Sequence, residues 1–102
     1  MAIIIAVSKH TPEICPANNK DHAKAIKEFS AKIGELTKKH GVKIVGMWIA
    51  MAEHAIIQVF EAPNFDAIQE LSMEPEVDNL LRYNTTKYKM AVNFQEAVAT
   101  LK

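Results

Sequence analysis

The sequence predicts an α+β fold of the ferredoxin-like type, in the order strand–helix–strand–strand–helix–strand, with an extra C-terminal helix. Three observations predict it. First, a run rich in β-branched residues (Ile3–Val7) precedes a long amphipathic segment (20–40). Second, two apolar strands follow with only a short turn between them. Third, the later of these two strands passes directly into a helix at Pro63 and Asn64. The length of 102 residues suits one domain with one core, spanning 1–102.

The first strand, Ile3–Val7, is apolar at every position, which is typical of a central strand buried on both faces. A loop over 9–19 follows, with two prolines and two asparagines, and it is long for a strand-to-helix connection. Asn18 or Asn19 is expected to cap the helix over 20–40. Its predicted buried stripe recurs every three or four residues: Ile26, Phe29, Ile33 and Leu36.

The remaining elements follow from alternation, helix signals and turn residues. We expect strands over 43–51, 55–61 and 85–93, a turn over 52–54, and helices over 65–71, after Pro75 and over 94–101. In the second strand, alternation places Val45, Met47 and Ile49 on one face and Ile44, Trp48 and Ala50 on the other.

Composition excludes several classes of function. The 12 basic and 12 acidic residues balance, so nucleic acid is not an expected partner. The N-terminal apolar run is too short to cross a membrane and lacks the features of a signal peptide. Cys15 is the one cysteine and cannot form an internal disulfide, which favours a reducing, cytoplasmic location. The absence of phosphate-loop and nucleophile-elbow motifs disfavours nucleotide hydrolysis and serine-type acyl transfer.

The pattern also predicts a homodimer. Right-handed crossovers place both helices of the repeated unit on one face of the sheet, yet the first two strands are apolar on both faces. A soluble monomer rarely leaves so large an apolar face uncovered, and a second copy of the sheet would cover it. The C-terminal helix is expected to pack on the partner, and dimers of this shape can stack into higher oligomers.

In element order the chain resembles the dimeric α/β-barrel superfamily, whose ferredoxin-like subunits pack sheet to sheet into a barrel. The stretch Ile56–Ala67 is similar to the strand-to-helix segment of small GYD-type families in that superfamily. The resemblance implies functions from cofactor-free monooxygenases and haem-degrading enzymes to isomerases and ligand-binding domains, so the fold does not decide among them. Haem-degrading members carry an axial histidine on a helix beside the pocket, and the segment 65–71 has none, so haem is not expected.

The long loop holds the strongest candidate chemistry. His10, Cys15 and His22 are ligand types for zinc, iron or copper, although the His-x4-Cys-x6-His spacing matches no standard metal motif. As catalytic residues, His10 is expected to act as a base or metal ligand and Glu13 as an acid or supporting ligand. In the alternative interpretation, the loop is exposed and Cys15 packs as a small hydrophobic residue.

Other side chains are candidates for a ligand pocket or for purely structural positions. His54 in the predicted turn joins a site only if the turn folds towards the pocket, and His40 is explained as a cation at a helix C-terminus. A buried carboxamide in an apolar strand needs a partner, which makes Gln58 the most suggestive of the ligand-binding candidates. These candidates are aromatic or amide side chains on or near strands: Trp48, Gln58, Tyr83 and Tyr88.

The sequence therefore predicts a small homodimer that binds a small molecule or a transition metal between sheet and helices, with the pocket mouth near the loop from His10 to Cys15. As an enzyme, it is expected to oxidise or isomerise a small organic molecule. The alternative is a non-catalytic dimeric module for binding or assembly.

Overall fold

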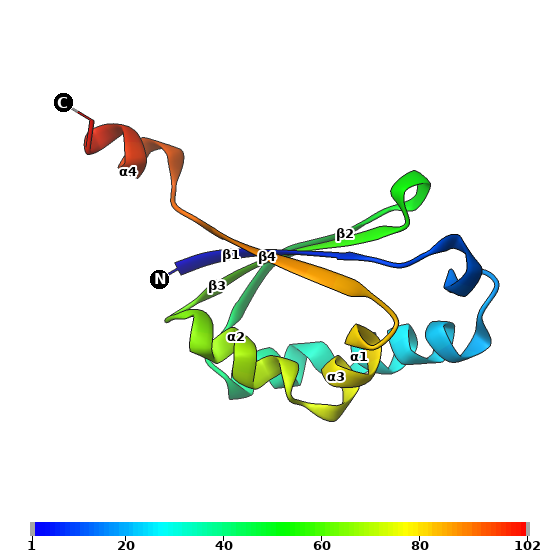
Figure 1. Cartoon of the computed structure of the whole chain (residues 1–102). Helices are drawn as coiled ribbons and strands as arrows, with labels where there is room; N and C mark the ends of the chain where they lie inside the picture. Colours follow the sequence, from blue (N-terminus) through cyan, green and yellow to red (C-terminus); the bar gives the residue numbers. More distant parts are fainter. Residues whose placement is uncertain (1, 102) are drawn as a thin grey trace.

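The computed structural model describes residues 2–101 and contains a four-stranded antiparallel sheet in the order β2-β3-β1-β4. Strands β1 and β3 are central, which the continuous apolar run predicted for the first strand, and helices α1 to α3 cover one face of the sheet (Figure 1). The ferredoxin-like prediction is confirmed. The strands are β1 (Ala2–Lys9), β2 (Lys43–Ala50), β3 (Ala55–Ala62) and β4 (Thr85–Ala91).

The helices begin where the capping residues predict. The Asn19 side chain accepts a hydrogen bond from the His22 amide at 2.9 Å, and Asn64 accepts one from the Ala67 amide at 3.0 Å. Pro75 occupies the first turn of its helix, where no amide hydrogen is needed. The helices are α1 (Lys20–Lys39), α2 (Phe65–Ser72), α3 (Pro75–Leu81) and α4 (Phe94–Ala99), with short 3-10 turns η1 (Pro12–Ile14) and η2 (Met51–Glu53).

The core lies between the sheet and helices α1 to α3. Ile4, Ala6 and Phe60 point from the two central strands into this layer and are almost completely buried. The predicted stripe of α1 meets them, with Phe29 and Ile33 buried. Each such side chain contributes roughly 1.5–3 kcal/mol by leaving water. Burial of this stripe, more than helix propensity, holds α1 against the sheet.

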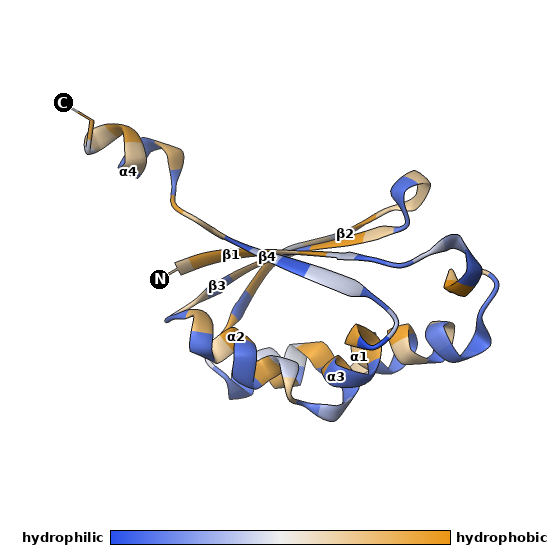
Figure 2. Ribbon diagram, viewed as in Figure 1, coloured by the Kyte–Doolittle hydropathy of each residue, from blue (hydrophilic) through white to orange (hydrophobic). Residues whose placement is uncertain are grey.

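The opposite face of the sheet is not covered by helices and is apolar at its centre, with charged side chains on the same face at Glu61 of β3 and at Lys87 and Lys89 of β4. Ile4 lies opposite Phe60, and Ala6 lies opposite Gln58; these side chains face the helices. Because side chains alternate along a strand, the intervening pair Ile5 and Val59 points to the opposite face. Figure 2 shows apolar residues along β1 and part of β2, whereas β4 is more hydrophilic. The apolar members of this open face are Ile3, Ile5, Val7, Trp48, Ile57 and Val59.

The predicted alternation of side chains in β2 is wrong at one point, because the strand contains a β-bulge. The register shifts between Ile44 and Gly46, and Ile44 then lies opposite Phe60 while Met47 lies opposite Gln58. Ile44 and Met47 therefore share the helix-facing side, where simple alternation had placed them on opposite faces. Trp48 lies on the open face, and its indole ring occupies the space that a side chain at Gly46 would fill.

Helix α4 extends from the end of β4 away from the body of the molecule (Figure 1). Phe94 at its start is 74% exposed, and Leu101, which follows the helix, is 75% exposed. The predicted last strand and last helix are each shorter at their C-terminal ends in the structure, ending at Ala91 and Ala99. Among residues 2–101, no helix combines the length and the apolar character needed to cross a membrane.

Candidate functional site

The pairing of the central strands brings two histidines together. Lys9 at the end of β1 lies opposite Ala55 at the start of β3. His10 directly follows Lys9 and His54 directly precedes Ala55, so the two histidines are neighbours just beyond the last paired residues. The His10 amide donates a hydrogen bond to the His54 carbonyl at 3.2 Å. Their rings meet edge to face with 5.3 Å between centroids. The topology of the sheet, and not proximity in sequence, creates this pair.

His54 occupies a strained backbone position. Its φ of 52° and ψ of 44° lie in the left-handed region, and its amide donates to the Met51 carbonyl at 3.2 Å to close η2. A non-glycine residue in a sparsely populated region costs roughly 1–3 kcal/mol. Histidine tolerates this conformation better than β-branched residues do. The strained turn sets the direction in which the imidazole leaves the backbone.

Cys15 is fixed by the loop between β1 and α1. Its amide donates to the Pro12 carbonyl at 3.3 Å, which closes η1. Its carbonyl accepts hydrogen bonds from the amides of Asn18 and Asn19 at 2.8 and 2.9 Å. The backbone is thus held on both sides of the cysteine, directly before α1 begins.

His22 supports this loop from inside the protein. Its side chain is fully buried, and Nδ1 lies 2.7 Å from the carbonyl oxygen of Ile14, so Nδ1 must carry the hydrogen and donate it. Nε2 then accepts from the Asn84 amide group, 3.3 Å away. The ring stacks on Tyr83 with centroids 4.8 Å apart. Since both ring nitrogens are engaged, His22 is placed as a support for the loop.

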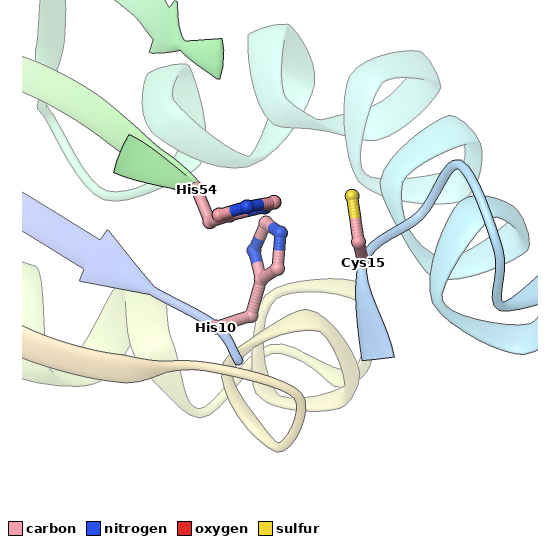
Figure 3. Close-up of side chains that lie close together, drawn as sticks. All are labelled: His10, Cys15 and His54. Carbon is pink, nitrogen blue, oxygen red and sulfur yellow. The ribbon is translucent and has the colours of Figure 1, made fainter. Parts of the chain in front are cut away.

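His10, Cys15 and His54 form a compact cluster. One ligand atom from each lies within 4.8 Å of the other two. Figure 3 shows the three side chains close together, arriving from the end of β1, the loop and the start of β3. Both ring nitrogens of His10 are buried and have no hydrogen-bond partner within the described residues. We call these three residues the His–Cys cluster.

The surroundings of His10 favour its neutral form. Burial, the largest cause, lowers the pKa of His10 below its ordinary value of 6.5. The Asn84 side chain beside it acts in the opposite direction, and charge repulsion from His22 and His54 lowers the pKa further. At neutral pH the imidazole is therefore uncharged, the form that accepts a proton or binds a metal.

A cavity of about 280 Å³ adjoins the cluster. His10, Cys15 and His54 form part of its wall, and most of the remaining wall is carbon. Organic ligands are usually held in sites of this kind, apolar with a few polar groups. The other lining residues come from the loop, α1, β2, η2 and β3: Pro16, Ala17, Ala23, Ile26, Lys27, Ile49, Met51 and Ile56.

Among the other predicted residues, Glu13 lies outside the cluster. It is exposed on η1, and hydrogen bonds from its own backbone amide and from the Thr11 side chain lower the pKa of its carboxyl group. Glu13 is not among the residues that line the cavity.

The predicted ligand-binding residues lie in two other places. Gln58 and Tyr88 line a space of about 30 Å³ between sheet and helices, which suits water and not an organic ligand. Burial raises the pKa of Tyr88, whose ring packs edge to face on Phe65. Trp48 lines a hollow of about 200 Å³ that shares Ile26, Ile49 and Ile56 with the cavity beside the cluster.

The fold and the site place this chain in a class of small ferredoxin-like α+β proteins. It is similar to an uncharacterized NIPSNAP domain protein from Burkholderia xenovorans, with a TM-score of 0.62 and 9% identity over 91% of this chain and 94% of that one. It is also similar to protein Atu4242 from Agrobacterium tumefaciens (TM-score 0.60, 16% identity, 90% and 92% covered). A third similar structure is an antibiotic biosynthesis monooxygenase (TM-score 0.59, 10% identity, 91% and 98% covered).

The particular family follows from the sequence. Residues 10–77 match the model described as Domain of unknown function (DUF3303), and the chain belongs to this family. The matched range includes the whole His–Cys cluster. No curated protein matches the chain. The similarity to these solved structures confirms the ferredoxin-like α+β fold.

Proposed function

We propose that this protein is a homodimeric oxidoreductase that binds a small, largely apolar organic molecule in the cavity beside the His–Cys cluster. The observation that carries this proposal is the combination at one place of an apolar cavity of about 280 Å³ and a buried imidazole without a hydrogen-bond partner among residues 2–101. His10 is thereby free to act on a bound molecule.

Two features support oxidation as the reaction class. The wall of the cavity offers imidazole and thiol groups, which transfer protons and electrons, beside carbon surfaces that hold an apolar molecule. A solved structure of the same fold is an antibiotic biosynthesis monooxygenase. In the proposed role His10 accepts a proton from the substrate, a step that isomerisation would share.

The homodimer is supported by the open face of the sheet. The central strand β1 presents Ile3, Ile5 and Val7 on the side away from the helices, and β3 adds Ile57 and Val59. A contiguous apolar face of this kind marks an interaction surface. A two-fold dimer covers it with an identical face and is the commonest form of soluble oligomer.

The binding site is tested with indole as an apolar probe, followed by amide chemical shifts in two-dimensional NMR. We expect shifts to concentrate at His10, Ala23 and Ile26. Ala23→Phe, which fills the cavity, should abolish them, and Ala31→Phe on the exposed side of α1 is the matched control. Shifts confined to the open face, or unchanged in Ala23→Phe, would contradict the proposed site.

The reaction is tested by oxygen uptake with 1,4-dihydroxynaphthalene. This hydroquinone passes two electrons and two protons to O₂, giving a quinone and hydrogen peroxide. We expect wild-type protein to accelerate uptake above the protein-free rate and His10→Ala to lose most of the acceleration. Equal rates in both proteins, with indole still bound, would remove His10 from any catalytic role.

A second candidate function is a non-catalytic dimeric module for binding or assembly. The exposed apolar residues of the C-terminal segment favour it, because Phe94 in α4 and Leu101 after it offer a contact surface remote from the cavity. Under this alternative, His10→Ala leaves every binding property unchanged. Deletion of residues 93–102 instead weakens self-association measured by light scattering.

A further inference from the structure

We propose that His10, Cys15 and His54 bind a transition-metal ion of the zinc and copper class. This inference rests on the proposed function, since it places the ion in the wall of the proposed substrate cavity. The structure supports it by geometry, by an unpartnered buried group and by the chemistry of the donors.

The geometry requires little rearrangement. Zinc bonds of about 2.0–2.3 Å to nitrogen and sulfur place the ligand atoms of a tetrahedral site roughly 3–4 Å apart. In the cluster these atoms already lie within 4.8 Å of one another. The backbones of His10 and His54 are tied by a hydrogen bond, so small side-chain rotations suffice.

The unpartnered group is His10. Both of its ring nitrogens are buried, and neither has a hydrogen-bond partner in the described part of the chain. Leaving a buried polar group unsatisfied costs about 1–3 kcal/mol, and most such groups in native proteins have a partner. A metal ion on one nitrogen would satisfy it.

The residues behind the cluster suit an outer shell around a metal. The Asn84 carboxamide lies beside His10, and its Oδ1 is buried without a partner within residues 2–101. With the ion on one His10 nitrogen, this oxygen is a candidate acceptor for the hydrogen on the other. Such outer contacts fix the tautomer and orientation of a ligating histidine. The His22 ring meets His10 edge to face with centroids 5.0 Å apart and restricts its movement.

The donor set selects the kind of ion. Two imidazoles and one thiolate suit zinc or copper, whereas magnesium and calcium require oxygen ligands. On binding, the Cys15 thiol releases its proton to solvent and forms the sulfur–metal bond, so one proton leaves for each ion bound. Three protein ligands leave a fourth position open, as catalytic zinc sites do. The adjoining cavity, which Met51 also lines, gives access to that position.

The test is a titration of reduced, metal-free protein with Co²⁺, followed by the thiolate-to-cobalt absorption band and by displacement with Zn²⁺. We expect one ion per chain. Cys15→Ser should remove the band, and His54→Gly, which suits the positive φ, should weaken binding roughly tenfold or more. His40→Ala is the control, because His40 lies outside the cluster and pairs with Glu74. Circular dichroism verifies that each variant is folded.

Absence of the band in wild-type protein, or unchanged binding in His54→Gly, would overturn the proposed site. Indole binding to the metal-free protein keeps the two proposals separate. Intact indole binding without cobalt binding rejects the metal site alone. Cobalt binding without indole binding rejects the cavity as a substrate site.

Discussion

His22 and Asn84 lie 62 residues apart in the sequence, yet Nε2 of one and Nδ2 of the other meet at 3.3 Å beneath the His–Cys cluster. The same Asn84 group also donates to the Leu80 carbonyl at 3.0 Å. The contact ties the first turn of α1 to the segment that connects α3 with β4. His10 therefore packs against a His22 ring that is itself held by hydrogen bonds.

His22→Ala should destabilise the protein by about 3 kcal/mol, because it opens a buried cavity, removes the stack on Tyr83 and leaves the Ile14 carbonyl without its donor. Urea denaturation measures the change. His22→Gln is the informative comparison, since an amide nitrogen restores part of the hydrogen bonding. A loss below 1 kcal/mol in His22→Ala would contradict the structural role.

His54→Gly should leave the stability unchanged or raise it by up to about 1 kcal/mol. Glycine adopts the left-handed conformation without strain, which offsets the greater flexibility of its unfolded chain. The urea midpoint of His54→Gly, compared with that of His54→Ala, checks the prediction. Ala should be the less stable of the two, and the reverse order would mean that φ at this position is not positive in solution.

Glu74 should make the stability depend on acid pH. Hydrogen bonds from Lys39, the larger cause, and from His40 lower the pKa of Glu74 below 4.5. A carboxyl group whose pKa is depressed in the folded state stabilises the protein above its unfolded pKa, and this contribution is lost as the pH falls through the folded value. The difference in urea midpoint between wild type and Glu74→Gln should thus be present at pH 7 and decrease as the pH falls below 4.5.

Glu35→Gln is the matched control for this measurement. Glu35 is exposed and lies 3.8 Å from Lys32 in a pair within one helix, a geometry that contributes little. Its urea midpoint should follow that of wild type at both pH values. A difference for Glu74→Gln that does not decrease between pH 7 and pH 3 would show that its ion pairs are not the cause.

Much of the fold was predictable because its determinants are local. Hydrophobic periodicity and capping residues located α1 and α2, and Asn19 and Asn64 act as the predicted caps. The bulge between Ile44 and Gly46 was not predictable from alternation. The Trp48 ring lies over Gly46, a position without a side chain next to the bulge, and alternation carries no information about such a contact.

The site was harder to predict because it depends on strand pairing. His10 and Cys15 share one loop and could be grouped from the sequence. His54 joins them only because β1 and β3 are antiparallel neighbours, a consequence of the ferredoxin-like order that places the end of one strand at the start of the other. His22, grouped with them by sequence spacing, uses both of its nitrogens elsewhere.

Gly46→Ala should move the indole of Trp48. A Cβ at position 46 would overlap the ring, which is 55% exposed and free to swing outwards. We expect a red shift of tryptophan fluorescence and a loss of about 1 kcal/mol or less, since overpacking is costly only where neighbours cannot move. Gly34→Ala, where nothing lies within 4 Å of the added carbon, is the control and should leave the emission unchanged.

Ile5→Glu should convert the proposed dimer into a monomer. Ile5 lies on the central strand between Val59 of β3 and Lys89 of β4 and points to the open face, so in a face-to-face dimer the new carboxylate would be buried in the interface. In the monomer the same carboxylate reaches water, and the helix-facing core is untouched. We therefore expect the molar mass by light scattering to halve while the circular dichroism spectrum is retained. Ala31→Glu, on the exposed side of α1, adds the same charge and should remain dimeric. A wild-type protein that is monomeric at high concentration would refute the packing argument, because the apolar open face would then be stable in water without a partner.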